Sequence, residues 1–275
     1  MKKLNTILKK AEAVQPLDIA DIRFLLALSD PEHVSALFQT ARHLRTRFFG
    51  TKIFLYGFVY TSTYCRNDCR FCFYRCSNPD ALRYRKNPAE IITAARRLTD
   101  SGVHLIDLTM GEDPEIFHRG PKGFDELTEL VAAVKAETGL PVMISPGVVP
   151  DNVLEQLGRA GATWYACYQE THCRPLFERL RINQSYTERL NKKHLAHRLG
   201  ILTEEGLLCG IGETIDDLAA SFEAIGHLDV DQTRVMNFVP QKGTPLQDIA
   251  PLDPMREFII MAVMRLAFPD RLIPA

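Results

Sequence analysis

Four of the seven cysteines in this 275-residue chain lie within one short segment, "TYCRNDCRFCFYRC", at Cys65, Cys69, Cys72 and Cys76. Thiols at this spacing can form disulfides, bind a zinc ion, or hold an iron–sulfur cluster. Disulfides are the least favoured, because the total of seven cysteines is odd and because a cytoplasmic protein keeps its thiols reduced. Metal binding is therefore the leading interpretation of the segment.

The first three cysteines have the spacing C-x3-C-x2-C. Three thiolates satisfy three corners of a [4Fe-4S] cube and leave the fourth iron free for a small ligand. The alternative is a structural zinc site with Cys76 as the fourth ligand, but such sites usually pair two short cysteine clips separated by a loop. The spacing favours the cluster and leaves zinc open, with Cys76 then a bystander thiol like Cys167, Cys173 and Cys209.

The composition is that of a globular protein, with 46% hydrophobic and 24% charged residues. The net charge is -1 and no block of like charges occurs, so we expect neither a nucleic-acid nor a membrane partner. The N-terminal "MKKLNTILKKAEAVQPL" is not a signal peptide, because charges return before an apolar run forms. The apolar run from Phe258 to Phe268 contains Arg265 and is too short to cross a bilayer. We therefore expect a cytoplasmic protein.

The elements that must position the cysteines follow a repeated pattern. Six apolar runs, each followed by a helical pattern, are typical of strands in a parallel sheet covered by helices. Repeated right-handed crossovers predict an α/β fold, a TIM-like (βα) barrel or partial barrel with six βα units. A doubly wound sheet is the alternative, but no glycine-rich dinucleotide fingerprint supports it. The predicted strands are Ile53–Tyr60, His104–Met110, Pro141–Gly147, Thr163–Glu170, Gly206–Gly210 and Thr233–Pro240.

Two units are expected along the chain: an N-terminal helical segment over 1–50 and the barrel over 51–275. A helix after the first strand has Asn87 as its N-cap, Pro88 at its first position and Gly102 as its stop. The final "RLIPA", Arg271 to Ala275, resembles the start of a seventh strand.

In such barrels the chemistry occurs at the carboxyl ends of the strands, which is where Cys65, Cys69 and Cys72 are expected. With Phe71 just before the third cysteine, the segment resembles the signature of radical S-adenosylmethionine enzymes. The resemblance implies a [4Fe-4S] cluster on these cysteines and S-adenosyl-L-methionine on its open iron, with Phe71 beside the cofactor. It further implies reductive cleavage to a 5′-deoxyadenosyl radical, with electrons from a donor such as flavodoxin or ferredoxin.

Further segments resemble motifs of that superfamily at successive predicted strand ends. "MGED" resembles its Gly-Gly-Glu motif, with Met110 in place of the first glycine, so that Gly111 and Glu112 would receive the cofactor's ammonium. The glycine-rich "GLLCGIGET" would lie against the adenine. Any one of these charges could be an ordinary helix-terminal residue, but their joint order favours the resemblance. The remaining cofactor residues that it implies are Ser145 in "SPG", Glu170 in "YQET" for the ribose, and Arg189 in "YTER" for the carboxylate.

A narrower resemblance is to the methylornithine synthases, relatives of biotin synthase and of a hydrogenase maturase. It is carried by "FVYTSTYCRNDCRFCFYRC", "DLTMGEDP", "NFVPQKGTPL" and "FPDRLIPA". It implies a lysine mutase that converts L-lysine to (3R)-3-methyl-D-ornithine by fragmentation and recombination, the first step of pyrrolysine biosynthesis. Another small substrate, or a non-catalytic zinc-binding protein of the same fold, remains an alternative.

The substrate residues that this resemblance implies are Asp107, in the second predicted strand, and Arg234, which opens the sixth. Lysine has two ammonium groups and a carboxylate, so a closed pocket for it needs charges of both signs. The alternative is that the two residues pair with each other or with polar neighbours. Members of that family continue beyond "RLIPA" with a substrate-binding Ser-x-Asp and two closing segments, so we expect a barrel whose closing strands are missing.

Overall fold

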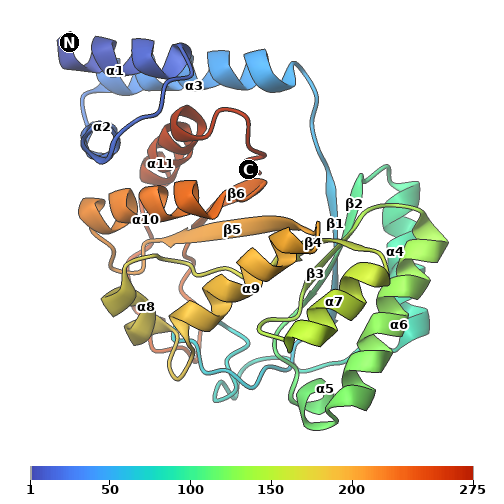
Figure 1. The fold of residues 1–275 in the computed structure, drawn as a ribbon. Coiled ribbons are helices and arrows are strands. Elements are labelled where there is room, and N and C mark those ends of the chain that lie inside the picture. The colour runs from blue at the N-terminus through green and yellow to red at the C-terminus, as the bar shows by residue number, and fades with distance from the viewer. Residues whose placement is uncertain (1, 275) are drawn as a thin grey trace.

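The computed structural model describes residues 2–274. Within them, six parallel strands form a single sheet in which each strand pairs with the next one along the chain. Figure 1 shows the sheet curled around its inner face, with helices on the outside. The predicted barrel of six βα units is confirmed in this open form. The strands are β1 (Tyr56–Ser62), β2 (Leu105–Met110), β3 (Val142–Ser145), β4 (Ala162–Ala166), β5 (Leu202–Cys209) and β6 (Gln232–Asn237).

A helix follows every strand and packs its apolar side against the outer face of the sheet. Two short helices, α5 (Pro114–His118) and α8 (Arg174–Leu180), lie in the connections that follow β2 and β4 and were not predicted. The covering helices are α4 (Pro88–Asp100), α6 (Pro121–Thr138), α7 (Asp151–Arg159), α9 (Tyr186–Arg198), α10 (Ile215–Leu228) and α11 (Pro254–Ala267).

The expected N-terminal helices are α1 (Lys2–Glu12), α2 (Ile19–Leu26) and α3 (Pro31–Phe49). Figure 1 shows them at the same end of the molecule as α11. Their buried leucines share one hydrophobic cluster with α10, α11 and β6, so this segment packs on the last third of the chain. In the part of the chain that the structure describes, no helix is both long enough and apolar enough to cross a membrane.

The local signals of α4 are confirmed. The Asn87 side chain accepts a hydrogen bond from the Glu90 amide, and the Glu90 side chain accepts one from the Asn87 amide, which forms a capping box with Pro88 at the first turn. The helix ends at Asp100, and Gly102 follows with a φ of 82° that a side chain would resist.

All six strands differ in at least one bound from the prediction, and the fourth and fifth differ most, by four residues at one end; β1 begins three residues later and β6 ends three residues earlier than predicted. β4 ends at Ala166, because the chain then leaves the sheet and Glu170 adopts a φ of 69°, touching the sheet again only through a single bridge to Leu207. β5 begins at Leu202, four residues before the predicted start, because Glu204 and Glu205 are buried within it. An apolar run cannot reveal a strand that carries two buried carboxylates.

The edges of the sheet are β1 and β6. Beside β6, Leu272 forms a parallel bridge with Gln232, and its carbonyl accepts a hydrogen bond from the Thr233 amide at 2.9 Å. The prediction that this segment starts a further strand is thus confirmed for one residue pair. A cavity of about 1240 Å³ lies between the two edges, with Tyr56 and Phe58 on one wall, Arg234 on the other, and α3 and α11 around its rim.

Candidate active site

The loop after β1 brings the three predicted cluster cysteines together. Cys69 is buried, and Cys65 and Cys72 are half-buried. Burial, together with the neighbouring Cys69 and Cys65 sulfurs, raises the pKa of the Cys72 thiol to about 12. Burial likewise raises the pKa of Cys65, with Cys69 contributing. Because their pKa values are raised, the Cys65 and Cys72 thiols need a nearby cation to become thiolates, and the iron of a cluster would supply that charge.

Cys76 has a different environment. It is exposed, and its sulfur contacts Asp68 Oδ1 at 3.6 Å. Among residues 2–274, no three His, Cys, Asp or Glu side chains are gathered tightly enough to hold a single metal ion.

The loop after β2 packs closely on the cysteine loop. A Cβ atom at Gly111 would lie 2.8 Å from Cys65 Cβ and 2.9 Å from its sulfur, so only glycine fits there. The Glu112 carbonyl accepts a hydrogen bond from the Arg66 amide at 2.8 Å. Met110 instead belongs to the outer hydrophobic cluster, so the close approach needs only the second position of the motif to be glycine.

Glu112 contacts polar groups from three different segments of the chain. Its carboxylate accepts hydrogen bonds from Arg66 Nε at 2.8 Å and from the Val148 amide at 3.0 Å. Arg189 Nη1 approaches to 4.0 Å, and a Cβ at Gly147 would lie 2.3 Å from the Glu112 side chain. The group that was expected to receive an ammonium is therefore held in place by the loop after β3.

Glu170 and Arg189 lie on the segments that follow β4. Glu170 Oε1 accepts a hydrogen bond from Arg181 Nη2 at 2.8 Å, while its buried Oε2 has no partner among the described residues. Burial raises the pKa of the Glu170 carboxyl, with Arg181 opposing the shift. Arg189 donates to the Tyr168 carbonyl at 2.8 Å, and its Nε has no partner in residues 2–274. Both side chains retain hydrogen-bonding capacity for a ligand.

Two further residues contact the cluster site and were missed in the sequence. Gln184 Nε2 lies 2.9 Å from the Cys69 sulfur, and Arg181 Nη1 lies 3.6 Å from it. The Arg181 guanidinium also lies 5.2 Å from the centre of the Phe71 ring. The only sequence signal was their place in "RLRINQ", a polar stretch between two helices.

Asp107 and Arg234 lie on the inner side of the sheet. Asp107 Oδ1 is buried and has no partner within the described chain, and burial raises the pKa of this carboxyl to about 7. Arg234 Nε donates to Glu204 Oε1 at 2.8 Å, while Nη2 has no partner among residues 2–274. The alternative that these residues pair with polar neighbours is therefore correct for Arg234, whose partner is Glu204. Glu204 was not predicted from the sequence.

Unpaired buried polar atoms are concentrated here. Such groups are rare in folded proteins, because each is costly unless water or a ligand completes it. Their presence on the residues predicted to bind cofactor and substrate fits a polar cofactor and a polar substrate. Among the residues with such an atom in residues 2–274 are Asp107, Thr109, Ser145, Glu170, Arg189, Glu204, Gln232, Arg234 and Asn237.

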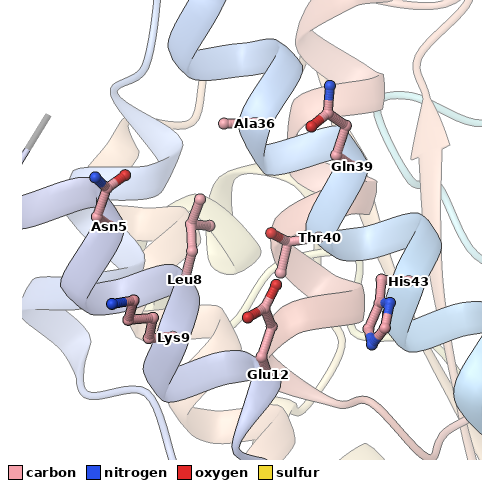
Figure 2. Close-up of a pocket in the computed structure, with 8 residues that line it drawn as sticks. All are labelled: Asn5, Leu8, Lys9, Glu12, Ala36, Gln39, Thr40 and His43. Carbon is pink, nitrogen blue, oxygen red and sulfur yellow. The ribbon is translucent and has the colours of Figure 1, made fainter.

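A second hollow of about 410 Å³ lies between α1 and α3. Figure 2 shows Glu12 of α1 beside Thr40 and His43 of α3, while the Lys9 side chain points away from them. None of its lining residues is among the buried side chains that lack a partner in the described chain. This hollow therefore lacks the unpartnered buried atoms that mark the predicted cofactor and substrate residues.

Comparison with known proteins agrees with this geometry. A model of the radical SAM superfamily matches residues 59–225. The chain is 43% identical to a 3-methylornithine synthase of Methanosarcina acetivorans over 255 residues, which are 93% of this chain and 71% of that protein. It is 31% identical to the [FeFe] hydrogenase maturase subunit HydE of Thermotoga maritima, over 91% of this chain and 70% of that protein.

Among solved structures, a crystal structure of methylornithine synthase (PylB) superposes with a TM-score of 0.92 and 40% identity. The match covers 98% of this chain and 78% of that one. A fold this similar over nearly the whole chain shows that the curled sheet and its loops are shared.

Proposed function

Since this chain belongs to the radical SAM superfamily and, within it, to the family of 3-methylornithine synthases, we propose that it rearranges L-lysine to (3R)-3-methyl-D-ornithine. Enzymes of this superfamily use a [4Fe-4S] cluster and S-adenosyl-L-methionine, and this chain does so as a member. When bound, these groups supply hydrogen-atom abstraction by a 5′-deoxyadenosyl radical. The electrons come from a small reduced donor of the flavodoxin or ferredoxin class.

The residues at the strand ends hold the cluster and the cofactor. Cys65, Cys69 and Cys72 are the cluster ligands, because they are the three sulfurs that lie together beside β1. Glu170 accepts the ribose hydroxyls through its unpaired Oε2, and Arg189 binds the carboxylate through its unpaired Nε. Glu112 and Gly111 receive the ammonium, Ser145 offers its unpaired hydroxyl, and Phe71 flanks the site.

The residues farther inside hold the substrate. Arg234 binds the lysine carboxylate through Nη2, and Asp107 binds an ammonium through Oδ1. Their task is to keep both halves of the substrate in place while its carbon skeleton is broken and rejoined. Buried charges fix such groups more firmly than water-exposed ones, because the effective dielectric is lower.

One observation carries this proposal: the predicted cofactor residues Ser145, Glu170 and Arg189 and the predicted substrate residues Asp107 and Arg234 each keep a buried polar atom that has no partner among the described residues. The test is anaerobic reconstitution, followed by incubation with S-adenosylmethionine, dithionite and L-lysine. We expect 5′-deoxyadenosine together with a lysine isomer that co-elutes with synthetic 3-methylornithine in chiral mass spectrometry. Cofactor cleavage with no isomer from lysine would contradict the substrate, and colourless protein with one zinc ion would contradict the cluster.

A further inference from the structure

We propose that Glu204 is a second substrate-binding carboxylate, which pairs with the α-ammonium of lysine while Asp107 pairs with the ε-ammonium. This inference rests on the proposed function and specifies how the site recognises a diamino acid.

Glu204 lies on β5, where its backbone pairs with Gln232 at the start of β6. Its side chain is fully buried. Oε1 accepts the hydrogen bond from Arg234 Nε at 2.8 Å, and the buried Oε2 has no hydrogen-bond partner among the described residues. One oxygen is sufficient to orient Arg234, so the second remains available to a ligand.

The charged groups converge on one space. Glu204 raises the pKa of Asp107 and Arg234 lowers it, and all three act on the pKa of the half-buried Tyr168. The Arg234 guanidinium lies 5.5 Å from the centre of the Tyr56 ring and 5.8 Å from that of Phe58, and Phe58 pairs with Asp107 between β1 and β2. Strands on opposite sides of the curled sheet thus direct their charges into the same interior.

The charges in this space match lysine. Two carboxylates and one guanidinium leave an excess of one negative charge, whereas lysine at neutral pH has two ammonium groups and one carboxylate. Without such a cation, a buried acid in this space retains a proton more readily, as the raised pKa of Asp107 shows. A monoamino acid would leave one carboxylate buried and unpaired, which disfavours its binding.

The assignment of the two ammonium groups follows from distance within the ligand. The α-ammonium and the carboxylate of lysine are attached to the same carbon, so their partners must be neighbours. Glu204 and Arg234 are hydrogen-bonded to each other and present free atoms Oε2 and Nη2. Asp107, on β2, is left for the far end of the side chain.

The test uses the reconstituted enzyme with S-adenosylmethionine and no reductant, so that ligands bind without reacting. Calorimetry compares L-lysine with 6-aminohexanoic acid, which lacks the α-ammonium, and with L-norleucine, which lacks the ε-ammonium. Glu204→Gln keeps an acceptor for Arg234 and removes the charge. We expect it to weaken lysine binding by about tenfold or more and to leave 6-aminohexanoic acid unchanged.

Asp107→Asn is the matched control, and it should reduce discrimination against norleucine while keeping discrimination against 6-aminohexanoic acid. Equal weakening of lysine and 6-aminohexanoic acid by Glu204→Gln would show that Glu204 acts only through Arg234 and would overturn the inference. If Glu204→Gln fails to load its cluster, Glu204→Asp keeps the charge on a shorter side chain and should partly reduce the same discrimination, whereas full discrimination would overturn the inference. Wild-type enzyme that binds no lysine would instead overturn the proposed function.

Discussion

At the scale of single residues, the environments of the four clustered cysteines are unequal. Cys69 lies close enough to Cys65 and Cys72 to contribute to the raised pKa of both thiols, whereas Cys76 is exposed and contacts Asp68. The Cys69 sulfur also accepts hydrogen bonds from the side-chain amide of Gln184 and from the guanidinium of Arg181. Hydrogen bonds to a cluster sulfur stabilise its negative charge. Of the three predicted ligands, Cys69 is therefore the one whose thiolate the side chains of the described residues stabilise most.

Single replacement of Cys65, Cys69 or Cys72 by serine should abolish cluster content after anaerobic reconstitution, because a cube held at two corners is readily lost. Cys76→Ser is the matched control from the same loop and should retain the cluster. Iron and sulfide analysis with the broad visible absorbance measures both. Equal loss at all four positions would contradict a three-cysteine site.

Glu170→Ala and Arg189→Ala should each weaken S-adenosylmethionine binding by about tenfold or more, because a charge-assisted hydrogen bond contributes about 1.5–3 kcal/mol. Titration calorimetry of the reconstituted protein measures the affinity. His194→Ala, on the same helix as Arg189, is the control and should bind normally. Unchanged affinity in the first two variants would refute these assignments.

Lysine affinity should rise with pH through about 7, because the Asp107 carboxyl is protonated below its raised pKa and pairs with an ammonium only when ionised. Glu204, Arg234 and the phenols of Tyr60 and Tyr168 face this carboxyl. Calorimetry from pH 6 to 8 measures the trend, and Asp107→Asn should remove it. A trend that persists in Asp107→Asn would assign the titration to another group.

At the scale of elements, the segment after β4 is held in place by a buried carboxylate on β5. Glu205 Oε1 accepts hydrogen bonds from the Gln169 and Gly206 amides at 2.8 and 2.9 Å. Its Oε2 lies 2.6 Å from Lys193 Nζ of α9. Glu205 therefore joins β5 and α9 to the residue that precedes Glu170, whose φ of 69° needs such support.

Glu205→Gln should destabilise the fold by about 3–5 kcal/mol, because it leaves the Lys193 ammonium buried without its counter-charge. The double variant Lys193→Met, Glu205→Gln is the control and should recover part of this loss. Denaturant unfolding of both variants measures the difference. If the single variant is as stable as the wild type, the pair does not hold the segment.

The same carboxyl should contribute to acid sensitivity. Lys193 and His172 lower the pKa of Glu205 to about 2 from 4.5, against the opposing effect of burial. A lowered pKa stabilises the fold fully above about pH 4.5, and this contribution is lost as the pH falls toward 2.

At the scale of the whole molecule, the curled sheet leaves an apolar hollow between its two edges. Ile53 of the segment before β1 and Phe258 of α11 line it, with 71% and 51% of their surfaces exposed. An exposed apolar region of this extent binds apolar ligands or other proteins. Arg234 also lines this hollow, so the proposed substrate-binding residue lies beside the exposed apolar side chains.

The 275-residue chain should therefore bind an apolar dye such as anilinonaphthalene sulfonate at this hollow. Ile53→Ser and Phe258→Ser should each lower the fluorescence enhancement. Leu82→Ser is the control, because Leu82 is 73% exposed but lies outside the lining residues. An equal decrease in all three variants would place the dye elsewhere.

The features that depend on local order could be predicted from the sequence alone. The alternation of strands and helices and the Asn87 cap were both predicted, because each depends on residues close together in the chain. The position of Ser145 at the end of β3 was predicted for the same reason. Family resemblance added the expected roles, which stay predictions.

The contacts between side chains that are distant in the sequence could be identified only in the folded structure. Arg181 reaches Cys69 across 112 positions, and Arg234 reaches Glu204 across 30. Such contacts depend on strand register and on the curl of the sheet, neither of which leaves a periodic signal in the sequence. Buried acids within β5 even concealed the start of the strand, because their partners lie on β6 and α9.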